Sequence, residues 1–328
     1  MAVLTILAVL FAAIRITLWT TVRRWVRGPR LPAWSWAYEV VVGILRWGAR
    51  RNSPRMVGQL RRVPPMPLVS VLRRHVQLEE GELAGRPVLT VQPHAWQPSD
   101  PTVLYFHGGG YVTCSPGTHR ALLARIALAG GARCVALDYR LAPEEPYPAA
   151  LEDALAACRA LRDQGVAPGQ LILGGDSAGG GLSMAVLLRL RELGEALPAG
   201  AVLLSPWVDL THQGDSIESC AETDYLGRDV LEYYARLYVD EDRVRDPMVS
   251  PVFADLEGLC PLLVQAGGAE VLRDQVRGLA DRAEAAGVDT RLEIYPDMVH
   301  VWHVLSPLCP EGQTAIRRIG EFVAEVCD

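Results

Sequence analysis

Apolar and polar residues change their spacing along the chain near residue 68. From Val69 onward, short apolar runs alternate with longer segments in which apolar residues recur every three or four positions. The short runs are typical of buried β-strands and the longer segments of amphipathic α-helices. This alternation predicts an α/β fold in which helices cover both faces of a mostly parallel sheet.

The predicted sheet has eight strands. No helical pattern separates the first two, which favours an antiparallel edge there. The predicted strands are 76–79, 87–92, 102–106, 133–137, 170–173, 199–204, 261–265 and 290–294. The predicted helices are 120–129, 148–164, 182–193, 272–286 and 314–326. Residues 211–252 interrupt the alternation, and we expect them to form a cap insertion above the carboxyl ends of the strands, where ligands bind in such folds.

Residues 1–30 form an apolar and then basic N-terminal segment. Residues 1–22 are almost wholly apolar apart from Arg15 and a few threonines, and arginines follow directly. This length could just span a bilayer, and the arginines on its C-terminal side would then leave the rest of the chain in the cytoplasm. The sequence leaves three alternatives open: a transmembrane anchor, a helix lying at the membrane surface, and a helix packed on its own domain.

Residues 31–67 precede the α/β pattern and are predicted to form N-terminal cap helices. The apolar spacing predicts one helix over 32–51 and a second, short one over 55–62. The proline-rich segment 63–67 forms the expected boundary to a catalytic domain at 68–328. Five of the eight tryptophans lie before this boundary. We expect this apolar surface either to cap the catalytic domain or to rest on lipid.

Charge is distributed unevenly between these two parts. The chain has a formal net charge of −6, yet residues 1–75 contain thirteen arginines and a single acidic residue, Glu39. Because these arginines are interleaved with tryptophan and aliphatic residues, they indicate an anionic lipid surface rather than nucleic acid as a partner. The alternative is that they form the solvated faces of cap helices.

The seven cysteines include no C-x-x-C pair and leave an odd one over. This count argues against a disulfide framework and against a zinc site. Cys134, Cys158 and Cys260 lie in apolar strand or helix patterns, so we expect them to be buried, reduced thiols. A reducing compartment, the cytoplasm, is the simplest location for such a chain.

A candidate nucleophile lies between a predicted strand and the helix that follows it. Gly175-Asp176-Ser177-Ala178-Gly179 fits the pattern G-x-S-x-G, in which glycines leave room for a strained turn around the serine. We expect Ser177 to lie exposed at the apex of this turn, with the N-terminal N–H groups of the helix at 182–193 directed toward it. The pentapeptide alone is a weak signal, which the strand before it and the helix after it strengthen.

A glycine-rich loop follows the predicted strand 102–106. The run His107-Gly108-Gly109-Gly110 exposes backbone N–H groups, because glycine has no Cβ to obstruct the approach of a ligand atom. We predict that Gly108, Gly109 and Gly110 form an oxyanion hole together with the N–H of Ala178, and that His107 holds the loop. The alternative is a flexible turn between strand and helix.

A serine nucleophile needs a base within reach and an acid that orients the base. His300 follows the last predicted strand, in a loop marked by Pro296, and His303 is its nearest competitor. The loop after the strand at 261–265 offers Glu270 as the acid. The order serine, acid, histidine along the chain is that of the hydrolase fold.

The other candidate acids and histidines are not expected to belong to the catalytic group. Asp274 is expected in the first turn of the helix at 272–286, where the helix dipole favours a negative charge. Asp297 lies on the same loop as His300 and cannot easily orient it toward a separate turn. Four further histidines are expected at the surface: His75, His94, His119 and His212.

Five motifs together resemble those of the hormone-sensitive-lipase family of α/β-hydrolases, from about residue 70 to the end of the chain. They are His107-Gly108-Gly109-Gly110, Asp138-Tyr139-Arg140-Leu141-Ala142-Pro143-Glu144, Gly175-Asp176-Ser177-Ala178-Gly179-Gly180, Ser205-Pro206-Trp207-Val208-Asp209-Leu210 and Gly268-Ala269-Glu270-Val271-Leu272-Arg273-Asp274. The resemblance implies an α/β-hydrolase fold with a helical cap over the acyl pocket, a carboxylesterase acting on short- to medium-chain acyl esters, and no metal or cofactor. It also implies that Gly109, Gly110 and Ala178 donate to the oxyanion. Two positions differ, because many members have Asp where Glu270 stands, and the family's His-Gly-Phe-like run is His300-Val301-Trp302 here.

The leading hypothesis is a serine carboxylic-ester hydrolase in which Ser177 attacks the ester, His300 moves the proton and Glu270 steadies the imidazolium. The same residues could open a lactone or remove an acetyl group. A hypothesis from a different class is a non-catalytic small-molecule receptor on the same fold, like some plant relatives. Those relatives have lost the catalytic histidine, so His300 favours catalysis.

The expected partner is a small-molecule ester. Three aromatic side chains near the motifs are predicted to contact it: Tyr111, Trp207 and Trp302. We expect no nucleic-acid partner. The sequence leaves open a homodimer and a membrane-surface association through residues 1–30.

Overall fold

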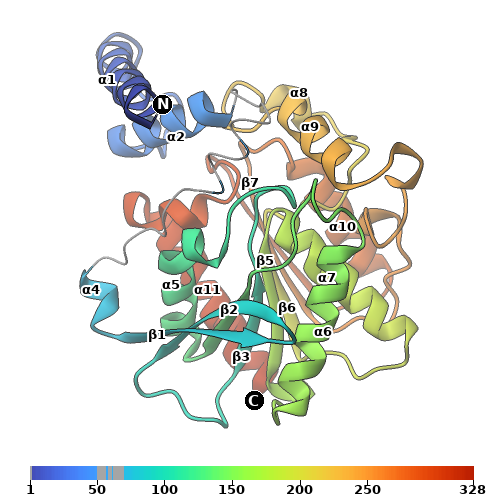
Figure 1. Ribbon diagram of the computed structural model, residues 1–328. Coiled ribbons are helices and arrows are strands. Elements are labelled where there is room, and N and C mark those ends of the chain that lie inside the picture. The colour runs from blue at the N-terminus through green and yellow to red at the C-terminus, as the bar shows by residue number, and fades with distance from the viewer. Residues whose placement is uncertain (1, 50–56, 58–60, 62–69) are drawn as a thin grey trace.

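The computed structural model describes residues 2–49, 57, 61 and 70–328 of the chain (Figure 1). The expected boundary at 63–67 lies outside the described residues, as does most of the predicted short helix at 55–62. The helix predicted over 32–51 is present as α2 (Trp36–Ala49).

An eight-stranded sheet with the order β1-β2-β4-β3-β5-β6-β7-β8 forms the centre of the molecule. The strands are β1 (Val76–Leu83), β2 (Arg86–Pro93), β3 (Thr102–Phe106), β4 (Arg133–Leu137), β5 (Leu171–Asp176), β6 (Gly200–Leu204), β7 (Leu262–Gly267) and β8 (Thr290–Tyr295). β2 runs antiparallel to both β1 and β4, and the other neighbouring pairs are parallel. The predicted mostly parallel sheet with an antiparallel edge is therefore confirmed.

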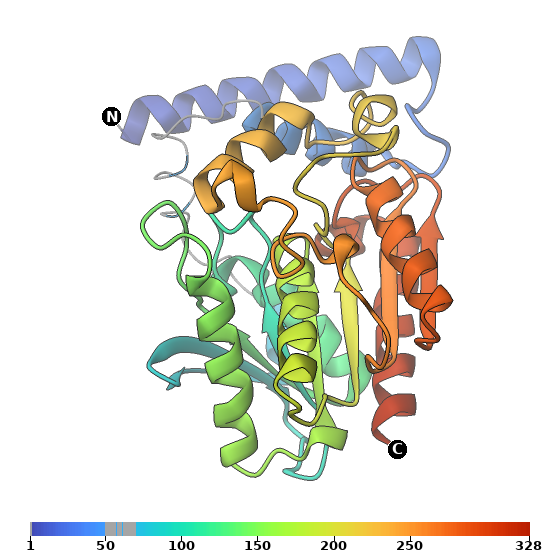
Figure 2. The same ribbon diagram turned by 90° about the vertical axis from the view of Figure 1, so that its right-hand side faces the viewer.

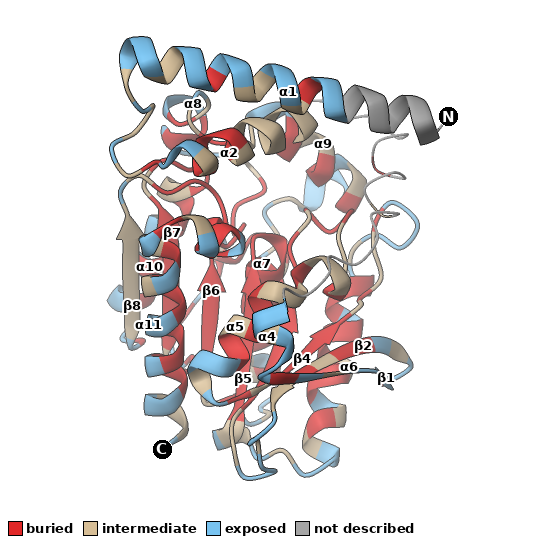
Figure 3. Ribbon diagram, turned by 90° about the vertical axis from the view of Figure 1, so that its left-hand side faces the viewer, coloured by how far each residue is buried: buried red, intermediate tan, exposed pale blue. Residues whose placement is uncertain are grey.

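Alternate side chains along each strand enter two separate cores, one on each face of the sheet. In β3, Leu104 and Phe106 belong to the larger core, whereas Val103 and Tyr105 belong to the second core. The larger core is covered by residues of α6 (Ala149–Asp163), α7 (Ala178–Glu192) and α10 (Arg273–Ala285), and the second by residues of α5 (Arg120–Gly130) and α11 (Pro310–Cys327). Figure 3 shows the buried positions along the strands and on the inner sides of these helices. Helices therefore cover both faces, as predicted.

The remaining elements are helices of the two covering layers and of a cap. They are α1 (Ala2–Arg27), α4 (Ser70–Arg73), α5 (Arg120–Gly130), α6 (Ala149–Asp163), α7 (Ala178–Glu192), α8 (Ser216–Ser219), α9 (Arg228–Tyr238), α10 (Arg273–Ala285) and α11 (Pro310–Cys327), with the short 3-10 helices η1 (Pro116–His119), η2 (Pro168–Gln170), η3 (Glu241–Arg243), η4 (Pro251–Phe253) and η5 (Trp302–Leu308).

A cap layer of α1, α2, α8 and α9 lies above the carboxyl ends of the parallel strands (Figures 2 and 3). α8 and α9 come from the insertion predicted at 211–252. Trp34 and Tyr38 at the N-terminal side pack with Met298 and Trp302, which follow β8, in a third apolar cluster. The cap therefore contacts the loop that contains His300.

Helix α1 rests on α2 and turns apolar side chains outward. The buried carboxylate of Glu39 lies 2.5 Å from Arg23 and 3.0 Å from Arg24, which joins the two helices. The large exposed apolar side chains of α1 are Leu10, Phe11, Ile14, Leu18, Trp19, Val22, Trp25 and Val26. Of the helices that the structure describes, none has the combined length and apolarity needed to cross a bilayer.

Helix α7 begins at Ala178, four residues before the predicted start at 182. The glycines at 179–181 form its first turn, although glycine disfavours a helix by about 1 kcal/mol relative to alanine. Packing explains their presence, because a Cβ at Gly179 would collide with the carbonyl oxygen of Phe106 in the neighbouring strand. Glycine here allows close approach of helix and sheet.

Other boundaries also differ from the prediction, most clearly those of α11 and β1. α11 begins at Pro310 rather than at 314, because proline suits the first helical turn, where its missing N–H is not needed. β1 extends to Leu83 instead of ending at 79, and Ala84 and Gly85 then turn the chain into β2 with φ of 51° and 76°. Left-handed φ at both turn positions is typical of a tight β-hairpin.

Candidate active site

Ser177 occupies the turn between β5 and α7 with φ 52° and ψ −120°. Such a left-handed conformation is strained for a residue with a side chain and is characteristic of a nucleophile at a strand-to-helix turn. Contrary to the expected exposure, only 8% of Ser177 is exposed, because the cap layer lies above this end of the sheet. The N-terminal end of α7 begins at the next residue, Ala178, and its dipole favours negative charge beside the serine.

The glycine loop after β3 lies beside this turn, because a Cβ at Gly108 would collide with the carboxylate of Asp176, the residue before Ser177. Gly109 and Gly110 have φ of 112° and 64°, conformations that glycine adopts at little steric cost. Within the described part of the chain, the N–H groups of Gly109, Gly110 and Ala178 have no hydrogen-bond partner. Gly108 differs, because its N–H donates to Asp176 Oδ1 at 3.1 Å. We therefore remove Gly108 from the predicted donor set.

Asp176, the residue before Ser177, fastens the glycine loop to the sheet. Its carboxylate accepts hydrogen bonds from Tyr105 Oη at 2.8 Å and from the Gly108 N–H, and it lies 3.2 Å from His119 Nε2. Burial alone would raise the pKa of Asp176, but His119 and Tyr105 outweigh it and lower that pKa to about 2. A carboxylate that is charged at neutral pH thus holds the loop beside the serine.

Two histidines predicted at the surface are buried instead. His119 lies in the Asp176 network, and the nearby carboxylate outweighs burial to raise its pKa. His212 is buried in the cap insertion, stacked on Trp207 with ring centroids 5.9 Å apart. Sequence position could not reveal these contacts, because the partners of His119, at the end of η1, and of His212, in a loop of the cap insertion, are set by how these segments fold back onto the protein. His75 and His94 are exposed, as predicted.

The candidate base and acid lie beside each other at the ends of β8 and β7. His300 Nδ1 is 3.8 Å from Glu270 Oε1, and both side chains are buried. This distance exceeds that of a hydrogen bond, so the two side chains are neighbours without being hydrogen-bonded. The other carboxylate oxygen of Glu270 accepts from Ser205 Oγ at 2.6 Å and from the Gly267 N–H at 2.8 Å.

Ser205 connects the acid to the base loop. While it donates to Glu270, its Oγ accepts the N–H of Val301 at 3.1 Å. A φ of 45° places this serine in the left-handed region. The sequence contained Ser205 in a motif but gave no sign that its hydroxyl joins the two loops.

A second buried carboxylate, which the sequence analysis did not single out, belongs to Asp224 between α8 and α9. It accepts N–H groups of Tyr225 at 2.8 Å, Val271 at 2.9 Å and His300 at 3.2 Å. Burial raises the pKa of Asp224 to about 6, with the His300 imidazole opposing and the Glu270 carboxylate adding to this shift.

His300 is affected by charges from several elements. Burial lowers its pKa, but the carboxylates of Glu270, Asp224 and Asp176 outweigh burial, so the pKa is raised above its ordinary value. A raised pKa makes the imidazole a stronger base and favours the imidazolium that forms when it accepts a proton.

The competing residues lie elsewhere. His303 Nε2 is 2.9 Å from Gln265 Oε1, and burial lowers the pKa of this histidine to about 3. Asp274 accepts the N–H of Ser216 at 2.8 Å at the start of α10. Asp297 accepts the N–H of Ala33 at 2.9 Å, which holds the N-terminal cap to the base loop.

The three predicted substrate-contacting aromatics are all buried. Tyr111 stacks on Tyr238 of α9 with ring centroids 3.8 Å apart, and Trp207 lies 6.2 Å from Tyr111. Trp302 packs 4.9 Å from Tyr295 in the cluster under α2, which favours a packing role for it.

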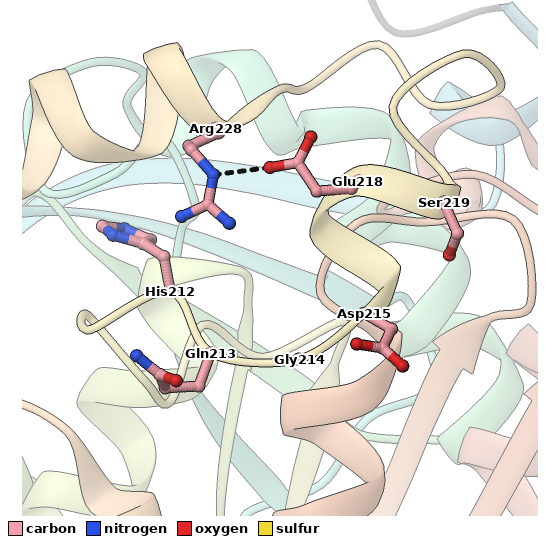
Figure 4. Close-up of a pocket in the computed structure, with 7 residues that line it drawn as sticks. All are labelled: His212, Gln213, Gly214, Asp215, Glu218, Ser219 and Arg228. Carbon is pink, nitrogen blue, oxygen red and sulfur yellow. Dashed lines mark hydrogen bonds and ion pairs between the residues drawn. The ribbon is translucent and has the colours of Figure 1, made fainter.

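An open pocket in the cap is separate from the candidate triad (Figure 4). It is lined by His212, Gln213, Gly214, Asp215, Glu218, Ser219 and Arg228. The Arg228–Glu218 ion pair of 2.6 Å bridges the pocket. Among the described residues, no group of three or more His, Cys, Asp or Glu side chains is placed to hold a metal ion.

Comparisons with known proteins show similarity to hydrolases and esterases. A family profile described as the alpha/beta hydrolase fold matches residues 103–304. The chain is 46% identical over 223 residues to an acetyl-hydrolase of Streptomyces hygroscopicus, covering 68% of this chain and 75% of that protein. It is 35% identical over 226 residues to an esterase of Acinetobacter venetianus, with the same two coverages.

Solved structures resemble the whole molecule. A mutant of the esterase E40 superimposes with a TM-score of 0.82 at 42% identity and covers 92% of this chain and 100% of its own. An esterase described as belonging to the bacterial hormone-sensitive lipase family gives a TM-score of 0.77 at 40% identity, with 97% and 98% covered.

Proposed function

The chain belongs to the hormone-sensitive-lipase family of α/β-hydrolases and is a carboxylic ester hydrolase, and from that premise we propose that it cleaves short- to medium-chain acyl esters through an acyl-enzyme formed on Ser177. The observation that supports this proposal is the strained turn of Ser177, next to a glycine loop that Asp176 anchors and in which the Gly109 and Gly110 N–H groups have no partner among the described residues. A strained serine beside free donors suits attack on a carbonyl carbon.

The reaction would follow from the roles of three side chains. Ser177 Oγ attacks the ester carbonyl and passes its proton to His300, while the N–H groups of Gly109, Gly110 and Ala178 hold the oxyanion. His300 then gives the proton to the leaving alcohol. A water molecule attacks the acyl-enzyme with His300 again as base, and the acid is released.

Glu270 would keep the imidazole oriented and stabilise its charged form. Its second oxygen is held by Ser205 and by the Gly267 N–H, so only one oxygen is left for His300. Glutamate in place of the aspartate of many relatives is one methylene longer, and these two hydrogen bonds fix the longer side chain.

An acetyl ester is a second candidate substrate. The supporting observation is that a relative at 46% identity is named an acetyl-hydrolase. Hydrolysis rates for p-nitrophenyl esters from acetate to decanoate would separate the two: a maximum at acetate supports deacetylation, and a maximum at butyrate to octanoate supports the broader esterase. A lactone in the same panel tests ring opening.

Covalent labelling tests the nucleophile directly. Phenylmethylsulfonyl fluoride should modify the peptide that contains Ser177, and peptide mass analysis would show the adduct. The Ser177→Ala protein should remain unlabelled at this peptide. If the wild-type protein neither hydrolyses any ester nor accepts the label but still binds a small molecule, the receptor hypothesis replaces this proposal.

The outward face of α1 is proposed to bind an anionic lipid surface. Its exposed apolar stripe includes Trp19 and Trp25, and the exposed Arg15 and Arg27 lie on the same helix. Tryptophan and arginine around an apolar stripe suit the boundary between headgroups and acyl chains. All seven cysteines are free thiols, which supports a cytoplasmic location and therefore the inner leaflet.

Vesicle sedimentation tests this surface. The protein should sediment with phosphatidylglycerol vesicles more than with phosphatidylcholine vesicles, and Leu18→Ser with Trp25→Ser should abolish the difference. Leu128→Ser, at an exposed leucine of α5, is the matched control and should behave as wild type. Equal sedimentation with both lipids contradicts the proposal. A dimer in light scattering that the α1 double variant dissociates would assign this face to a homodimer.

A further inference from the structure

Residues 220–225 of the cap insertion connect the two loops that carry the candidate acid and base. Asp224 in this segment is 0% exposed and binds the N–H of Val271 with one oxygen and the N–H of His300 with the other. Val271 directly follows the acid, Glu270. One side chain from the cap therefore holds the backbone beside both residues.

This segment is itself fastened from two sides. Thr223 Oγ1 donates to the carbonyl oxygen of Ala269 at 3.0 Å, on the acid loop. From the N-terminal side, Arg30 donates to the carbonyl oxygen of Glu222 at 2.5 Å, and Arg46 donates to the same oxygen. A support that is held by its own hydrogen bonds keeps a functional side chain in place more accurately than a free loop.

We propose that Asp224 is a positioning residue of the esterase reaction: its carboxylate joins the acid loop to the base loop and adds a second negative charge beside the imidazole of His300. The inference rests on the proposed roles of Ser177 and His300. A second carboxylate favours the imidazolium through which each half-reaction passes. The Asp224 carboxylate also keeps the imidazole aligned with the carboxylate of Glu270, because both loops are held by this one side chain.

The titratable groups that face His300 include three carboxylates, those of Glu270, Asp224 and Asp176, and the imidazole of His303. Asp176 stays ionised through His119, and His303 stays neutral because burial lowers its pKa. Glu270 and Asp224 are therefore the carboxylates whose loss would change the charge at the base most. The two can be separated, because Glu270 approaches the ring nitrogen whereas Asp224 binds the backbone N–H of the same residue.

The pH dependence of kcat/KM with a p-nitrophenyl ester tests Asp224. In Asp224→Asn the acid limb, the part of the profile in which kcat/KM falls as the pH is lowered, should move to lower pH by roughly one unit or more. The reason is that a negative charge beside the base is lost. Its kcat should fall by up to about 10²-fold, with a smaller change in KM, because the two loops lose their common anchor. Asp224→Glu retains the charge, so its acid limb should stay in place although kcat falls. Asp274→Asn, which removes a carboxylate that does not face His300, is the matched control for the limb.

An unchanged acid limb in folded Asp224→Asn would overturn the inference, as would an equal shift in Asp224→Glu. If Asp224→Asn does not fold, NMR titration of wild-type His300 decides the question. The His300 ring signals should titrate in two coupled steps, and a single titration step would overturn the inference. Absence of ester turnover in the wild-type enzyme would instead refute the proposed function, and the NMR titration would still test Asp224.

Discussion

Two buried carboxylates have the same number of hydrogen-bonding neighbours, yet their pKa values shift in opposite directions. Asp176, beside the proposed oxyanion loop (the oxyanion side), and Asp224, beside the proposed base His300 (the base side), each have three such neighbours. Yet the pKa of Asp176 is lowered to about 2, and that of Asp224 is raised to about 6. The number of hydrogen bonds therefore does not decide the ionisation of a buried acid.

The kind of neighbour explains the difference. Asp176 has His119, whose imidazole can carry a positive charge, and a phenol donor from Tyr105. Asp224 has backbone N–H donors and faces another carboxylate, Glu270, so its burial is less well compensated. The oxyanion side is thus built to keep one charge, whereas the base side holds two carboxylates around one imidazole and is sensitive to protons.

Removal of the proposed nucleophile should lower the rate most, because neither the base side nor the oxyanion side can act on an ester without it. Ser177→Ala should lower kcat by up to ~10⁶-fold, as expected for loss of a nucleophile of this type. Thermal unfolding should stay near wild type, since the hydroxyl contributes little packing. Near-wild-type hydrolysis by the pure variant would remove the serine from the mechanism.

Loss of charge on the base side should come next. Glu270→Gln should lower kcat by up to ~10⁴-fold, by analogy with an Asp→Asn change in a serine triad. His300→Ala should be as severe as Ser177→Ala, and His303→Ala much milder. Steady-state kinetics of Asp274→Asn provide the control. If that variant were the more damaging while still folded, the assignment of the acid would be wrong.

Loss of charge on the oxyanion side should have a smaller effect on the rate. Asp176→Asn loosens the loop that carries Gly109 and Gly110, so kcat should fall by about 10²-fold, near the value for one lost oxyanion donor. The acid limb of its pH profile should move less than that of Asp224→Asn, because Asp176 affects His300 least among the three carboxylates. An equal or larger movement would contradict the proposed division between the sides.

The two carboxylates should also contribute to stability with opposite signs. Asp176, with a lowered pKa, stabilises the fold above its unfolded pKa and loses this contribution as the pH falls toward 2. Asp224, with a raised pKa, costs stability on the order of 2 kcal/mol as the pH rises from 4 through 6. Urea unfolding at pH 4.5 and pH 7 measures the second effect. The stability of wild type relative to Asp224→Asn should be lower at pH 7 than at pH 4.5, and the reverse order would refute the raised pKa.

The smallest change in stability and rate is expected for a residue of the N-terminal cap that contacts the base loop. Tyr38 Oη lies 3.5 Å from the N–H of Val299, a weak contact. Tyr38→Phe should therefore destabilise the protein by less than about 1 kcal/mol and change kcat only a few-fold. Thermal unfolding and kinetics of the same sample check both values, and a loss comparable to Asp224→Asn would show that this hydroxyl is a main anchor.

The sequence alone predicted those parts of the molecule that depend on local patterns. Strand periodicity predicted the sheet, and the glycines around Ser177 predicted a strained turn, because both follow from backbone sterics. The roles of Asp224 and His119 depend on partners far along the chain. Asp224 meets Val271 over 47 positions and His300 over 76, and His119 meets Asp176 over 57. Such contacts leave no local pattern in the sequence.

The hydrogen bond from Trp34 Nε1 to the carbonyl oxygen of Asp297 spans 263 positions, so the first helices of the chain support a loop near its end. During synthesis, the N-terminal cap cannot reach its place until the last strand has left the ribosome. Contacts of such long separation form late and slowly in folding. The enzyme should therefore acquire its activity only at the end of folding. Until then chaperones would meet the apolar side chains that the cap later packs on the base loop, such as Trp34 and Tyr38.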